Sequence, residues 1–210
     1  MANTLTGGYG LQPIGLVGSA VHNNGTTQYE IASNYTTAIY NGGIVVPASS
    51  GTIIISDQAI APLGVLGGVN YVDSTTKKPT WLNYWPGSNS VSVDTNHPVK
   101  AYVYDNPMQL FKVVADGTNT DRATALTGVF ANCDMASVNN GSTNTGKSSD
   151  MLDISSVATT NTFDVRIVGL LDDPANADYS AVGHQYIVRL NGHFNSGTTI
   201  AVGTYATTGI

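Results

Sequence analysis

The chain has 210 residues, a formal net charge of −6, and charged side chains at only 10% of its positions, against about 25% in an ordinary soluble domain. Binding to nucleic acid requires clustered Lys and Arg, and eight such residues scattered through an acidic chain predict no nucleic-acid partner. The single cysteine, Cys133, excludes an intramolecular disulfide. Because the start of the chain is polar and no long apolar run follows, we expect neither a signal peptide nor a membrane span.

The first ten residues contain three glycines and predict a flexible N-terminal arm over 1–10, which a partner would order. We expect the remaining residues, 11–210, to form a single β domain. The beginning of this domain consists of short β-rich runs separated by Asn- and Gly-rich turns, a spacing typical of a barrel or a sandwich. These runs are Ile14–Val17, Gln28–Ile31, Thr36–Tyr40, Ile44–Val46 and Thr52–Ile55.

The next segments are less regular. Ala59–Asp73 is apolar but interrupted by Pro and Gly, which favours tightly curved strands over a helix. Residues 73–96 are polar and predict a long loop. This loop holds the one concentration of aromatic residues, Trp81, Tyr84 and Trp85. Two interpretations remain open: the aromatic side chains are exposed for binding, or the tryptophans close one end of a barrel.

Two β-rich runs, Val99–Tyr104 and Gln109–Val114, flank a turn sequence that contains Pro107 and predict a hairpin-like unit. The only helix that we expect has an N-cap at Thr120 or Asp121 and ends near Gly128.

The last part of the chain begins with a second long loop over 136–162, which carries a short strand near Leu152–Ile154. Alternation then predicts a strand in Phe163–Leu171, with Tyr186–Leu190 as its neighbour. Asp172–Asp178 is expected to be a turn with a brief helical start, and Thr198–Ala206 a last edge strand. The fold class is therefore mainly β, a compact barrel or sandwich with long loops and at most one or two short helices.

No combination of residues predicts catalysis, a cofactor site or a metal site. Ser19 lacks the Gly two residues later that a nucleophile elbow has. Asp116–Asp121 superficially resembles a calcium loop but lacks its Gly and its terminal Glu, so a turn with a helix cap is the simpler reading. Asp172 and Asp173 are adjacent and favour a turn over the separated carboxylates of a glycan hydrolase. The histidines are scattered, at His22, His97, His184 and His193.

An ordered series of short phrases resembles the head decoration (capsid cement) proteins of tailed bacteriophages. The resemblance is spread over most of the chain, and the segment Lys77–Pro86 departs from it. The phrases are Tyr9–Ile14, Tyr29–Tyr40, Gly42–Val45, Tyr102–Pro107 with Leu110 and Phe111, Ser142–Asp153, Val165–Leu170 and Val188–His193.

The resemblance implies a structural virion protein, made in the cytoplasm of a bacterial host, that binds the outer surface of a phage capsid and stabilises the shell. The implied partners are the major capsid protein and neighbouring copies of the chain in a dimer or trimer, with no nucleic acid and no membrane. The alternative is a carbohydrate-binding virion module, such as a fibre or lectin-like domain, with an aromatic platform. The candidate interface residues are Leu5, Tyr9, Leu11, Trp81, Tyr84 and Trp85.

Overall fold

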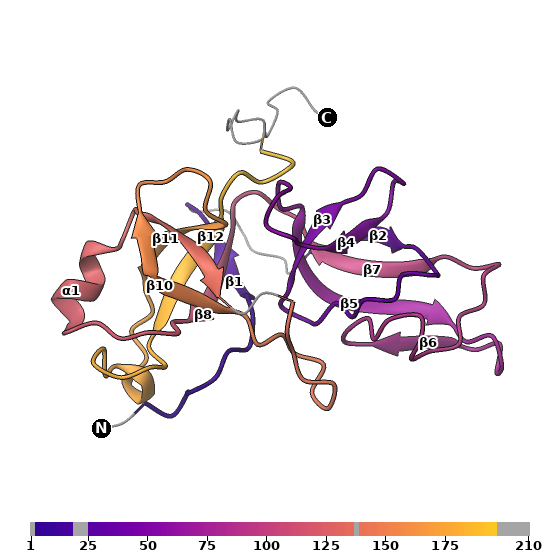
Figure 1. The fold of residues 1–210 in the computed structure, drawn as a ribbon, viewed down its shortest axis with the longest axis horizontal. Helices are drawn as coiled ribbons and strands as arrows, with labels where there is room; N and C mark the ends of the chain where they lie inside the picture. The colour runs from indigo at the N-terminus through magenta and orange to yellow at the C-terminus, as the bar shows by residue number, and fades with distance from the viewer. Residues whose placement is uncertain (1–2, 19–24, 137–138, 197–210) are drawn as a thin grey trace.

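A computed structural model of the chain describes residues 3–18, 25–136 and 139–196. The described residues are mainly β, as predicted, and form two antiparallel sheets that lie side by side (Figure 1). None of the described helices is long and apolar enough to cross a lipid bilayer.

The first sheet has the strand order β1-β8-β12-β11-β9-β10. The adjacent strands β11 and β12 of this sheet pair with each other, as the sequence predicts. Leu152 of β10 also bridges Ala115, which directly follows β8, so the sheet curls and encloses its own core. The strands are β1 (Gln12–Leu16), β8 (Gln109–Val114), β9 (Asn132–Ala136), β10 (Met151–Ala158), β11 (Val165–Leu170) and β12 (Gln185–Leu190).

The second sheet has the strand order β2-β7-β5-β3-β4, and a sixth strand, β6, also pairs with β5 outside this linear order. Alternate residues of β7, namely Val99, Ala101 and Val103, are fully buried, which is the expected pattern for a strand with one face on a core. The strands are β2 (Thr27–Ile31), β3 (Ile44–Pro47), β4 (Ile53–Ile55), β5 (Gly64–Val72), β6 (Pro79–Leu82) and β7 (Val99–Tyr104).

The predicted hairpin of β7 and β8 is wrong, although both strands have the predicted bounds. β7 pairs with β2 and β5 in the second sheet, whereas β8 pairs with β1 and β12 in the first. The buried side chains of β7 belong to one hydrophobic cluster, and Phe111 and Val113 of β8 belong to the other. The connection that contains Pro107 therefore crosses from one sheet to the other.

Other expectations need smaller corrections. Thr36–Tyr40 is not a strand, because only Ile39 bridges another segment, at Trp85. The long loop over 73–96 contains the strand β6, and the short strand expected at Leu152–Ile154 is the eight-residue β10. The last edge strand, expected at Thr198–Ala206, lies outside the described residues.

The predicted helix is confirmed as α1 (Arg122–Thr127). The carboxylate of Asp121 accepts a hydrogen bond from the Thr124 N–H at 2.7 Å, and Gly128 follows the helix as its C-cap. The brief helical start near Asp173 is also confirmed, as the 3₁₀ turn η1 (Pro174–Asn176).

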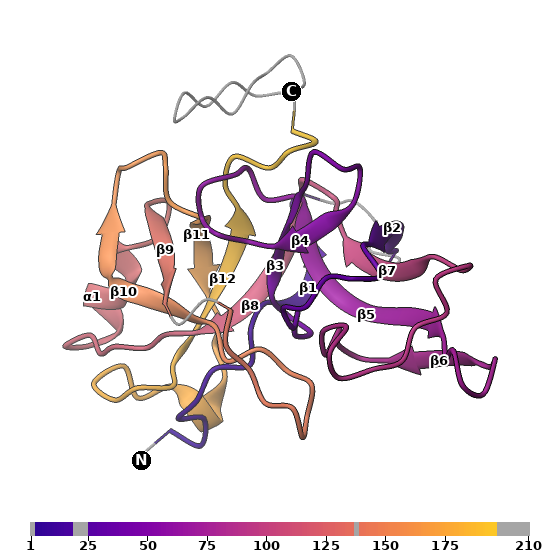
Figure 2. The same cartoon turned by 45° about the vertical axis from the view of Figure 1, so that its right-hand side comes forward.

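The two sheets with their loops are called the first lobe and the second lobe. Ile44 and Val65 belong to strands of the second lobe but pack in the core of the first, so the lobes share an apolar boundary. Residues 139–150 reach across this boundary (Figure 2), where Lys147 bridges Asn41 in parallel orientation. The Asn83 side chain donates a hydrogen bond to the Thr145 carbonyl at 2.6 Å. This part of the predicted long loop therefore packs on its own chain.

Candidate interaction surface

The N-terminal segment, residues 3–10, lies against the first lobe. The Asn3 side-chain amide donates hydrogen bonds to the carbonyls of Asp178 and Val182, at 2.8 and 3.0 Å. The Asn176 side-chain oxygen accepts a hydrogen bond from the Leu5 N–H at 2.9 Å. The expectation of an arm that only a partner orders is therefore wrong for these residues, because buried amides of the same chain hold them in place.

Contacts of Tyr9 hold the end of this segment against the first lobe. The Tyr9 hydroxyl donates to the Gln185 side chain at 2.6 Å, and the Lys112 ammonium lies 5.8 Å from the centre of the Tyr9 ring. Leu11 is only 1% exposed and belongs to the first core. The prediction of Leu11 as an interface residue is therefore wrong, whereas Leu5 and Tyr9 are partly exposed.

The three aromatic residues of the 73–96 segment lie in three different environments. Trp85 is fully buried, with its indole N–H donating to the Tyr35 carbonyl at 3.0 Å, so the prediction of Trp85 as an interface residue is wrong. Tyr84 stacks on Tyr40, with ring centres 5.3 Å apart. Only Trp81 is largely exposed, at 55%. The three side chains do not make a common platform.

Trp81 has an aromatic neighbour that sequence spacing did not reveal. Trp81 on β6 and Tyr102 on β7 both flank β5, and their ring centres are 4.8 Å apart. Gly68 of β5 lies beneath the indole, and a Cβ at that position would crowd the Trp81 ring. Pairing through the intervening β5 creates this contact, and no local sequence pattern signals it.

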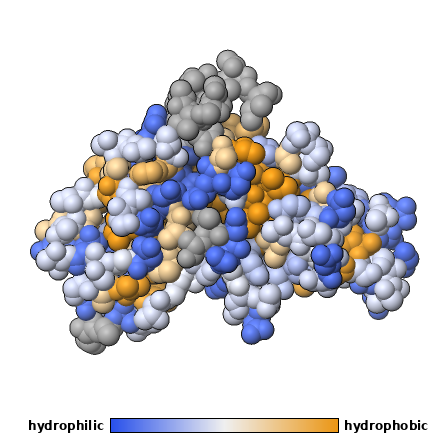
Figure 3. Space-filling model, in the orientation of Figure 1, coloured by the Kyte–Doolittle hydropathy of each residue, from blue (hydrophilic) through white to orange (hydrophobic). Residues whose placement is uncertain are grey.

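A second exposed apolar surface lies at the free edge of the first sheet. Within the described residues, β1 pairs only with β8, and the Val17 N–H donates to the Met108 carbonyl at 2.9 Å just beyond the strand. Ile14 and Val17 are each more than a third exposed, and Met108 is 48% exposed. We call Ile14, Val17 and Met108 the edge strip. On the face shown in Figure 3, hydrophobic residues form separate patches among hydrophilic ones.

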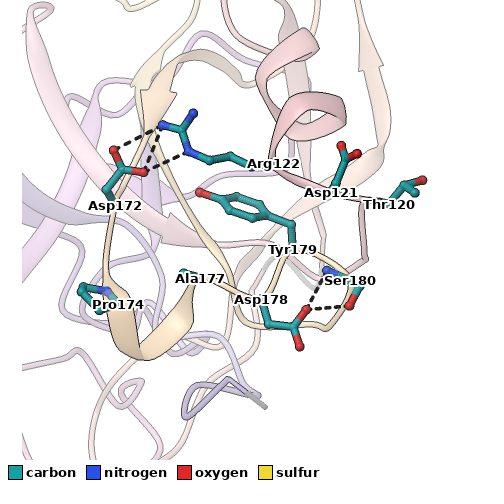
Figure 4. Close-up of a pocket in the computed structure, with 9 residues that line it drawn as sticks. All are labelled: Thr120, Asp121, Arg122, Asp172, Pro174, Ala177, Asp178, Tyr179 and Ser180. Carbon is teal, nitrogen blue, oxygen red and sulfur yellow. Dashed lines mark hydrogen bonds and ion pairs between the residues drawn. The ribbon is translucent and has the colours of Figure 1, made fainter. Parts of the chain in front are cut away.

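A cavity of about 450 Å³ lies between α1 and η1 (Figure 4). Two of its lining residues form an ion pair, in which the Arg122 guanidinium lies 3.2 Å from the Asp172 carboxylate. Asp178 accepts hydrogen bonds from the backbone and hydroxyl of Ser180, and Asp121 caps α1. These carboxylates therefore have hydrogen-bond or ion-pair partners within the chain.

Asp173 and Cys133 also have structural roles, whereas Ser19 and His22 lie outside the described residues. Asp173 caps η1 and accepts a hydrogen bond from the Gln185 side chain at 3.1 Å, which confirms the turn reading. Burial raises the pKa of the Cys133 thiol to about 12, and the thiol donates to the Asp153 carbonyl. In the residues that the structure describes, no three His, Cys, Asp or Glu side chains converge as a metal site.

Comparisons of the chain with protein-family models, with curated proteins and with solved structures found no match.

Proposed function

We propose that the chain is a capsid decoration protein that binds the outside of a phage shell and stabilises it. The ordered phrases that resemble this family supply the biological setting. The observation that carries the proposal is the edge strip, an apolar surface beside a free strand edge on a chain with only 10% charged residues. A surface of this kind favours contact with another protein over hydration.

The proposed partners are the major capsid protein and neighbouring copies of the chain. A free edge such as β1 can add to a partner's sheet through backbone hydrogen bonds, with Ile14 and Val17 supplying side-chain contacts. Weak contacts repeated by the symmetry of a shell combine through multivalency into strong attachment. The described N-terminal segment is docked on its own chain, so the edge strip replaces it as the main candidate contact.

Co-sedimentation with expanded capsids that lack the protein tests this proposal. The wild-type chain should bind saturably, and Ile14→Asp and Val17→Asp should each lower occupancy at a fixed concentration, because a charge would be buried in an apolar contact. Ser49→Asp adds the same charge to the exposed loop between β3 and β4 in the second lobe and should bind like the wild type. Equal binding by all four proteins would remove the edge strip from the interface, and no saturable binding would refute the decoration role.

A carbohydrate-binding virion module is the second candidate, and the exposed Trp81 beside Tyr102 is the observation that favours it. Aromatic faces of this kind stack on sugar rings. Titration with host surface polysaccharide should then shift the tryptophan fluorescence of the wild-type chain. The shift should disappear in Trp81→Phe, because the buried Trp85 would not report on the ligand. A wild-type titration without a shift would refute this candidate.

A further inference from the structure

A separate cavity of about 210 Å³ lies beside the connection between β7 and β8. Its walls come from that connection, from β11, and from the end of β12 with the residues that follow it. The lining side chains that bear on ligand binding are Met108, Arg166, Arg189 and His193. This pocket is called the arginine pocket. It is distinct from the cavity between α1 and η1.

The two arginines face each other without an acidic partner. Arg166 of β11 and Arg189 of β12 are directly opposite in the antiparallel register, and like charges in that position destabilise a sheet. All 14 acidic side chains lie within the described residues, and none forms an ion pair with either guanidinium. Burial, together with the charge of Arg166, lowers the pKa of Arg189.

The hydrogen bonds of the two guanidinium groups leave donors free. Arg166 donates from Nε to the Asn132 side-chain oxygen at 3.1 Å, and Arg189 donates from one Nη to the Met108 sulfur at 3.6 Å. A guanidinium carries five N–H donors. A sulfur atom is a weak acceptor and does not neutralise charge.

The wall of the pocket contains a third donor without a partner. His193 is only 4% exposed, and its Nδ1 accepts a hydrogen bond from the Asn195 N–H at 3.1 Å. Burial lowers the pKa of His193 to about 4, so the ring is neutral at pH 7 and carries its proton on Nε2. This buried Nε2 has no hydrogen-bond partner, whereas nearly all buried polar groups in native proteins have one.

We propose that the arginine pocket is a binding site for an oxyanion, a phosphate or a carboxylate, held between Arg166 and Arg189 with His193 as a further donor in the wall. Planar guanidinium groups bind both kinds of anion through paired, charge-assisted hydrogen bonds. An anion there offsets the repulsion across the β11–β12 pair and satisfies donors that the chain leaves free. This inference does not rest on the capsid proposal.

The oxyanion has two possible sources, a free anion or an acidic side chain of a bound protein. Met108 lines the pocket and also belongs to the edge strip. A partner segment on the edge strip could therefore place a carboxylate in the pocket. Inorganic phosphate and acetate serve as probes for the two sources.

The test is isothermal titration calorimetry and thermal unfolding of the full chain with each probe, with ionic strength held constant by NaCl. We expect saturable binding and a rise in the unfolding midpoint. Arg189→Gln should weaken binding by about tenfold or more, which is the effect of losing one charge-assisted interaction. The variant should fold, because it relieves a repulsion between neighbouring arginines.

Lys100→Gln is the matched control, since it removes one positive charge from an exposed position of β7. It should bind the probes like the wild type. Saturation by phosphate alone supports a free anion, and saturation by acetate alone or by both probes supports a site open to carboxylates. The proposal is overturned if neither probe saturates, or if Arg189→Gln and Lys100→Gln respond to the probes like the wild type, which would indicate a general salt effect.

Discussion

Replacing Asp150 by Asn should stabilise the protein above neutral pH and leave its stability nearly unchanged in acid. Asp150 precedes β10 and is 3% exposed, and its Oδ1 has no hydrogen-bond partner. Burial raises the pKa of this carboxyl from 3.8 to about 7, although hydrogen bonds with Ser148 and the Asn139 backbone partly oppose the rise. The folded state therefore keeps a proton that the unfolded state has already released.

The sign and size of the effect follow from this difference in proton binding. Stability falls as the pH rises from the unfolded pKa of 3.8 to the folded pKa of about 7. A shift of about three units, at about 1.4 kcal/mol per unit, sets an upper bound of about 4 kcal/mol. Asp150→Asn cannot ionise, so its advantage in the free energy of unfolding should grow from near zero at pH 4 to as much as about 4 kcal/mol at pH 8.

Urea unfolding of both proteins at several pH values between 4 and 8 measures this difference. Burial lowers the pKa values of His184 and His193, so these groups make stability rise with pH, opposite to Asp150. Both proteins carry these histidines, so their contribution cancels in the difference between the two free energies of unfolding. Asp57→Asn removes a carboxylate from an exposed position and should show no growing advantage. An advantage of Asp150→Asn that does not increase with pH would refute the reasoning.

Two further predictions test the docked N-terminal segment and the corrected aromatic assignments. A Cβ at Gly183, where φ is +110°, would overlap the Leu5 carbonyl, so Gly183→Ala should release the N-terminal segment and speed the amide exchange of its residues. Gly169→Ala is the control, because a Cβ there meets open space and should leave this exchange unchanged. Trp85→Ala should lower the free energy of unfolding in urea by about 3–5 kcal/mol, because it empties a fully buried site. Trp81→Ala at the surface should lower it by only about 1 kcal/mol, the size of its ring contact with Tyr102. Unchanged exchange in Gly183→Ala, or similar losses in the two Trp variants, would contradict these assignments.

Local signals in the sequence located some of the individual elements with accurate bounds. The bounds of β7 and β8 and the cap at Asp121 follow from alternation and from capping chemistry. The pairing of β11 with β12 was also predicted correctly, because both runs alternate and lie close together in the chain.

Long-range pairing was not accessible in the same way. A turn with Pro107 suits a hairpin and a crossover equally, and only burial in two separate cores decides that β7 and β8 belong to different sheets. The glycines at 7, 8 and 10 suggested a mobile arm, but Asn3 and Asn176, at distant positions in the chain, hold this segment in place.

The candidate surface was predicted only in part. Spacing identified the aromatic segment but could not separate the exposed Trp81 from the buried Trp85. Nothing local indicated that Arg166 and Arg189 would face each other, because this contact depends on the register between two strands.

The most direct test of the decoration role is the temperature at which expanded capsids rupture, with and without the bound chain. The proposal predicts that the rupture temperature rises with occupancy and reaches a plateau when the capsid sites are full. Rupture at the same temperature as bare shells, at full occupancy, would contradict a stabilising role for this protein.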